Sequence, residues 1–135
     1  MKKYIALTVC AVVFAGFIAC KKNPESEAKS LFSDMNALTE SCAIKITDSK
    51  TGKEAGAVLN EFSVKFKALN IRAKDLEKKF PDFKFNENPA IKTEGEKLQA
   101  SMQKFITGVM SASVKYSQDK DFQDAMTKMT DSMKQ

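Results

Sequence analysis

The chain has 135 residues, with 22 basic and 17 acidic side chains and a formal net charge of +5. It contains neither histidine nor tryptophan, which excludes a Ser-His-Asp triad, a histidine general base, and histidine-ligated zinc or haem. Both signs of charge are interspersed and Arg72 is the sole arginine, so the pattern is not that of a protein that binds nucleic acid.

The first predicted element is an export signal. Lys2 and Lys3 precede an apolar run over 4–19, and Ala19 supplies the small residue typical of a signal cleavage point. The run is shorter than the roughly 20 residues that span a bilayer as a helix, which argues against an uncleaved anchor. Cys10 follows a bulky valine and is not predicted as the processing site.

The residues around the predicted cut carry a resemblance to a known class. The stretch Phe17-Ile18-Ala19-Cys20 resembles the bacterial lipobox, in which a signal peptidase cuts before a cysteine that carries a diacylglycerol. Phe17 replaces the usual leucine, as in the relaxed lipoboxes of spirochaetal lipoproteins, and the chain resembles their small helical members. The resemblance to the lipobox covers only the signal. It implies that Cys20 bears fatty acyl chains such as palmitate and anchors the protein in the cell envelope, at the periplasmic or outer face of the outer membrane.

Cleavage before Cys20 divides the chain into three parts. Residues 1–19 are the signal that is removed, 20–23 are the lipidated N-terminus and a short tether, and 24–135 form one domain. Loss of Lys2 and Lys3 lowers the formal charge from +5 to +3. Cys42 is then left without a partner in its chain, and we expect a buried thiol, with pairing between chains as the alternative.

The first helix is predicted from Asn23-Pro24, a cap followed by a first-turn proline, to Thr47. The end of this segment, 43–47, alternates between apolar and polar residues and also fits a short strand. Apolar residues at steps of three and four form its core stripe: Ala28, Leu31, Met35, Leu38 and Cys42, widened by Phe32 and Ile46.

The second helix follows a turn over 48–52. Thr51 and Glu54 match a capping box, and Pro81 ends the helix. Its stripe keeps the seven-residue repeat of helices that pack at shallow angles: Phe62, Phe66, Leu69, Ala73, Leu76 and Phe80.

The third helix is predicted to begin at Asn88-Pro89, and Asp119 is predicted to cap a shorter fourth helix. Gly95 lies on the core face of the third helix, where its small size favours close approach of another helix. The core stripes are Ile91, Leu98, Met102, Phe105, Val109, Ala112 and Tyr116 in the third helix, and Phe122, Met126, Met129 and Met133 in the fourth.

These elements predict an all-α fold: an antiparallel helical bundle of three long helices plus a shorter C-terminal helix. Residues 24–49 carry five acidic and two basic side chains, whereas 53–79 carry four acidic and seven basic ones, so we expect the first two helices to attract. The stripes can be buried within one chain or between two, which leaves the oligomeric state open.

Two clusters could carry binding chemistry. Phe80, Phe83 and Phe85 surround the break at Pro81 and form either an exposed interaction tip or a cover buried over the end of the bundle. The methionines of the fourth helix could bind Cu(I), but their place on the Phe122 stripe favours core packing. No metal and no cofactor are therefore predicted.

The sequence thus predicts a membrane-anchored envelope lipoprotein with a non-enzymatic binding or structural role. Its partners would be the membrane, through the lipid on Cys20, and a protein of the envelope or of a host. An exposed apolar patch near Phe83 and Phe85 would favour this role. The alternative is a carrier that holds a small apolar ligand within a loosely packed bundle.

Overall fold

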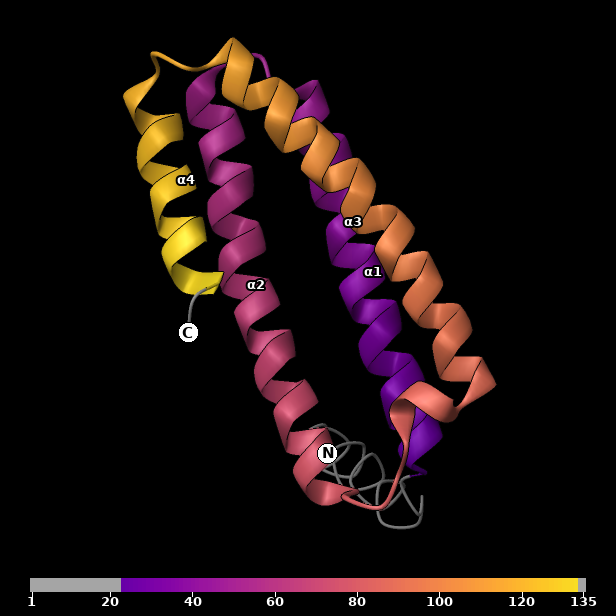
Figure 1. Ribbon diagram of the computed structural model, residues 1–135. Helices are drawn as coiled ribbons and strands as arrows, with labels where there is room; N and C mark the ends of the chain where they lie inside the picture. The colour runs from indigo at the N-terminus through magenta and orange to yellow at the C-terminus, as the bar shows by residue number, and fades with distance from the viewer. Residues whose placement is uncertain (1–22, 134–135) are drawn as a thin grey trace, which may run out of the picture.

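The computed structural model describes residues 23–133, and these form an all-α helical bundle, as predicted (Figure 1). Consecutive helices are joined by short connections, and the longest connection contains a single turn of 3₁₀ helix. The elements are α1 (Pro24–Asp48), α2 (Gly52–Lys79), the 3₁₀ turn η2 (Phe85–Glu87), α3 (Pro89–Lys115) and α4 (Lys120–Met133).

Each helix begins at the cap that the sequence predicts. A side-chain oxygen of the cap residue accepts a hydrogen bond from a first-turn amide that has no partner within the helix. The cap bonds are Asn23 Oδ1 from Glu25 N (3.0 Å), Thr51 Oγ1 from Glu54 N (3.2 Å), Asn88 Oδ1 from Ala90 N (3.0 Å) and Asp119 Oδ1 from Phe122 N (3.1 Å). Local sequence therefore fixes where the helices start.

The strand considered over 43–47 is absent, because α1 continues as a helix to Asp48. Ile46 is 3% exposed and packs against α3 at Gly108, so the helical face is held by tertiary contact. Thr47 Oγ1 also donates to the Ala43 carbonyl at 2.8 Å, a bond that helical geometry permits. Packing overrides the strand-like alternation of this segment.

The closest neighbours in the bundle are not consecutive in the chain. Helix α1 packs most closely against α3, and α2 packs against α4. The contact between α1 and α2 joins these two pairs (Figure 1). Successive helices run in opposite directions, so both close pairs, α1/α3 and α2/α4, are parallel. Side chains fill the wider space between α2 and α3, where the rings of Phe62 and Phe105 stack at 4.2 Å between centroids.

Glycines allow the two close pairs to form. A Cβ atom on Gly108 would lie 2.7 Å from Ile46 Cγ2 of α1, and one on Gly56 would lie 3.0 Å from the Asp121 carbonyl of α4. The close approach predicted at Gly95 is not found, since the nearest atom, in Phe32, would lie at an ordinary 3.8 Å. The sequence identified a glycine on the core face but not the ones at the tight contacts.

The core is divided into two clusters because α4 is half as long as α2. All four helices contribute to the larger cluster, which is centred on Phe62 and Phe105, with 0% and 2% of their surface exposed. The smaller cluster lies at the other end and contains Ala28, Leu31, Met35, Leu76 and Ile91. The predicted stripes supply most of both clusters, and the first turns of α2 add buried residues that the prediction omitted: Ala55, Val58 and Leu59.

Complementary charges connect α1 and α2, as the charge counts predict. Glu27 of α1 pairs with Lys79 at 2.7 Å, and Asp34 pairs with Arg72 at 2.7 Å. Lys45 pairs with Glu61 of α2 at 2.9 Å. Such partly exposed pairs contribute about 0.2–1 kcal/mol each, so they help to set the register of the two helices and add little stability.

Candidate interaction surfaces

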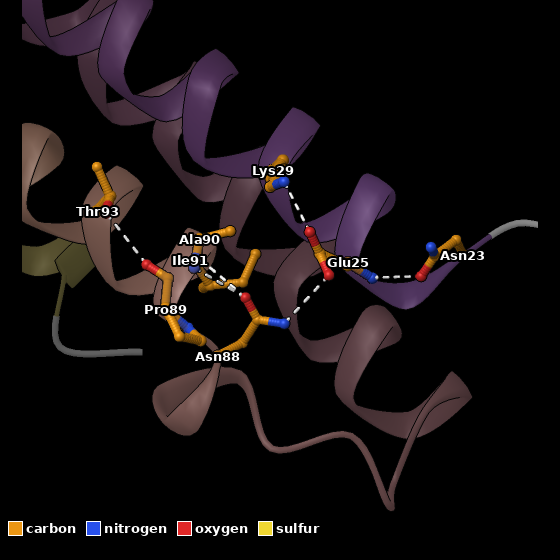
Figure 2. Close-up of polar contacts among 8 residues, drawn as sticks. All are labelled: Asn23, Glu25, Lys29, Asn88, Pro89, Ala90, Ile91 and Thr93. Atoms are coloured by element: carbon orange, nitrogen blue, oxygen red, sulfur yellow. Dashed lines mark hydrogen bonds and ion pairs between the residues drawn. The ribbon is translucent and has the colours of Figure 1, made fainter.

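The predicted anchor lies directly before the first described turn. Ala19 and Cys20 are outside the described residues, and Cys20 precedes the Asn23 cap of α1 by three positions. In the first turn, Glu25 forms an ion pair with Lys29 at 2.7 Å and accepts a hydrogen bond from Asn88 Nδ2 at 3.3 Å (Figure 2). Asn88 therefore caps α3 and also ties the start of α3 to the start of α1.

These contacts shift the pKa of the Glu25 side chain. The hydrogen bond from Lys29 and then that from Asn88 stabilise the carboxylate and lower the pKa of Glu25 below its usual value of 4.5. Glu25 is therefore ionised at neutral pH and accepts both hydrogen bonds as a carboxylate.

The three aromatic residues of the proposed tip lie at this same end of the bundle. Phe80, Phe83 and Phe85 are partly buried and pack against the smaller core cluster. The rings of Phe83 and Phe85 meet edge to face at 4.8 Å. The three rings thus pack over the end of the bundle while part of their surface stays accessible, and among the described side chains of the connection Pro81, Asp82, Lys84 and Glu87 are exposed.

The fourth-helix methionines behave as core residues where the structure describes them. Met129 is 8% exposed, and Met126 packs against the same cluster as Phe122. The side chain of Met133 lies outside the described residues. Within the described part of the chain, no group of three or more cysteine, aspartate or glutamate residues is arranged to hold a metal ion.

Cys42 is a free thiol, 0% exposed in the larger core cluster, as expected. Burial, followed by the negative charge of Glu61, raises the pKa of the Cys42 thiol above its usual value of 9.0. The thiolate is the reactive form, so the group is protonated and unreactive at neutral pH.

The apolar residues exposed to solvent are on the helices rather than at the aromatic connection. On α3, Ile106, Met110 and Val114 are 46%, 66% and 81% exposed and follow one another at one-turn spacing. Met110 is two residues after Gly108, so this face points away from α1. This second apolar stripe, with residues four apart in the sequence, was not among the predicted functional residues.

Two open grooves run along the bundle. One, of about 610 Å³, follows α1 and α3 and includes Thr47, Lys104 and Gly108 in its lining. The other, of about 690 Å³, follows the second half of α2 and includes Phe66, Ile71 and Ser132. Ser132 belongs to the last turn of α4, so this second groove begins where α4 ceases to cover α2.

The interior offers little room for a ligand. A space of about 140 Å³ adjoins the smaller cluster, with Leu31, Met35 and Phe85 in its lining. A cavity of about 150 Å³ accommodates benzene, so this volume is far below what a fatty acid requires. Every buried side-chain nitrogen and oxygen among the described residues also has a hydrogen-bond partner. The space beside the smaller cluster is therefore too small to hold an acyl chain.

Comparison with known proteins gives no assignment: no family model, no curated protein and no solved structure matches the chain. Over residues 23–133, none of the helices combines the length and the apolar character needed to cross a membrane.

Proposed function

We propose that this protein is a lipid-anchored component of a bacterial cell envelope, with a non-enzymatic binding or structural role. The observation that carries the proposal is the placement of Cys20 directly after Ala19, at the end of an apolar run that two lysines precede. Acylation of Cys20 would supply a stable anchor, because two or three chains together bind a bilayer far more tightly than one.

The surface of the bundle supports a binding role for the domain. Ile106, Met110 and Val114 present apolar side chains to solvent along α3, as contact sites for other proteins commonly do. The lack of histidine in the chain supports a role without catalysis. A protein of the envelope or of the host is the partner class that fits an anchored domain of this kind.

Protease treatment of intact cells, followed by mass spectrometry, tests the proposal. The peptide that begins at Cys20 is expected to carry acyl chains, and the chain with Cys20→Ser is expected to lack them and to keep its signal segment, because the signal peptidase of this pathway cuts before the acylated cysteine. Digestion of the domain on intact cells places it on the outer face, whereas protection until the outer membrane is opened places it in the periplasm. An unmodified Cys20 in the mature chain would overturn the proposal.

A further inference from the structure

The end of the bundle nearest to Cys20 is one continuous surface built from three helices. Asn88, the cap of α3, donates to Glu25 in the first turn of α1 (Figure 2). Lys79, the last residue of α2, pairs with Glu27 of α1. The connection from Phe80 to Asn88 joins α2 to α3 across this end (Figure 1). We call this surface, the first turn of α1 together with residues 80–88, the basal end.

The chain between the acylated cysteine and the basal end is very short. Lys21, Lys22 and Asn23 follow Cys20, and α1 begins at Pro24. A fully extended chain advances at most about 3.6 Å per residue, so the Cα atoms of Cys20 and Asn23 are at most about 11 Å apart. An acylated Cys20 is held at the headgroups of the lipid layer, and the start of α1 must therefore remain within that reach of them.

On this basis we propose that the basal end lies against the lipid headgroups and that the opposite end of the bundle points away from the membrane. This inference rests on the proposed acylation of Cys20. The opposite end contains the turns between α1 and α2 and between α3 and α4 (Figure 1). It is about 37 Å away along the 25 residues of α1, given the rise of 1.5 Å per helical residue.

The chemistry of the basal end suits a headgroup layer rather than the hydrocarbon beneath it. Phe80, Phe83 and Phe85 pack inward on the smaller core cluster, so they are not presented for insertion. Among the described side chains of the connection, the exposed ones are polar or proline, and Lys84 pairs with Glu87 at 3.0 Å. Lys21 and Lys22, next to the acylated residue, carry positive charge that favours anionic headgroups.

The charge of α1 disfavours contact with an anionic bilayer along the flank of that helix. Residues 24–49 carry five acidic and two basic side chains. A bundle that lay on the flank of α1 would bring this acidic excess against an anionic bilayer, which repels it. Contact through the basal end brings only the first turn of α1 close to the headgroups, where Glu25 is paired with Lys29 and Glu27 with Lys79.

A single fluorophore at each end tests this orientation, since the chain has no native tryptophan. Asp82→Trp is placed in the exposed part of the connection, and the matched control Gln118→Trp is placed in the exposed turn between α3 and α4. The acylated full-length variants are incorporated into vesicles of phosphatidylcholine and phosphatidylglycerol that carry a nitroxide on the headgroup. We expect quenching of the Asp82→Trp fluorescence and no quenching of the Gln118→Trp fluorescence.

The possible outcomes distinguish a wrong orientation of the bundle from a missing lipid anchor. Equal quenching at the two ends, or stronger quenching of Gln118→Trp, would overturn the orientation while acylation stands. Failure to find acyl chains on Cys20 by mass spectrometry would remove the proposed function and this inference with it. A flexible Gly/Ser insertion of about 20 residues between Lys22 and Asn23 should abolish the difference, because such a linker spans about 25 Å. A difference that survives this insertion would contradict the short tether as its cause.

Discussion

At the residue scale, Gly108 sets the distance between α1 and α3. Its hydrogen faces Ile46, whose β-branched side chain has few rotamers with which to move away. A glycine in the middle of a helix costs about 1 kcal/mol relative to alanine, so a mid-helix glycine needs a packing reason. At Gly108 the reason is the contact with α1, and at Gly95 the structure offers none.

The two glycines give a matched pair of substitutions. In Gly108→Ala, the new Cβ atom would lie 2.7 Å from Ile46 Cγ2, so we expect overpacking to lower the free energy of unfolding by about 1–2 kcal/mol net of the gain in helix propensity. In Gly95→Ala, the nearest contact is 3.8 Å, and we expect a gain of roughly 0.5–1 kcal/mol. Urea unfolding followed by circular dichroism measures both. Equal effects of the two substitutions would contradict the tight contact at Gly108.

Burial also decides the chemistry of Cys42. In a chain that begins at residue 20 and carries Cys20→Ser, Cys42 is the sole cysteine. We expect a thiol reagent to modify it at least about tenfold more slowly in the native protein than in denaturant, because the reaction requires local opening. The time course of modification at neutral pH measures this. Similar rates in the two conditions would indicate an exposed thiol that is able to pair between chains.

At the scale of elements, Glu61 joins the first two helices. It accepts hydrogen bonds from Lys45 of α1 at 2.9 Å and from Lys65 of α2 at 2.7 Å, and these lower its pKa from 4.5 to about 2. A carboxyl group whose pKa is lower in the folded state stabilises the fold above its unfolded pKa. The contribution is therefore complete above pH 4.5 and is lost as the pH falls toward 2.

This titration predicts how one substitution acts at two pH values. We expect Glu61→Gln to lower the free energy of unfolding at pH 7 by about 0.2–1 kcal/mol, the range of partly exposed ion pairs, and to have little effect near pH 2. Unfolding curves of both proteins between pH 2 and pH 7 measure the difference. A constant difference over this interval would contradict an ionic role for Glu61.

At the scale of the whole molecule, the length of α4 divides the bundle into a four-helix half and a three-helix half. The 14 residues of α4 cover the first half of α2, and beyond Ser132 the flank of α2 borders an open groove. Phe62 lies under this cover with 0% exposure, whereas Phe66, one turn further, is partly buried and stacks on Phe62 at 5.0 Å. The stability of the fold is expected to concentrate in the four-helix half.

Two substitutions on one helix test this distribution. Phe62→Ala removes a ring that contacts Phe105 across the core, and we expect a loss of about 3–5 kcal/mol in the free energy of unfolding. Phe66→Ala removes a ring of equal size at the edge of the region that α4 covers, and we expect about half of that loss in the free energy of unfolding. Urea unfolding of both variants provides the comparison. Equal losses would show that α4 does not define the end of the main core.

The sequence by itself determined the helices, their caps and the apolar stripes. Asn23, Thr51, Asn88 and Asp119 act on amides within three residues, so local sequence is enough to place them. The lipid-attachment motif predicted at Cys20 is likewise a local pattern, and it is the basis of the proposed function.

Only the tertiary structure decided which helices lie closest. The spacing of apolar residues shows that a face is buried but not which helix covers it, so the parallel pairs α1/α3 and α2/α4 could not be read from the stripes. The contact at Gly108 and the cover formed by Phe83 and Phe85 depend on residues that are distant in the chain. The same holds for the exposed stripe at Met110, because exposure depends on where the neighbouring helices end.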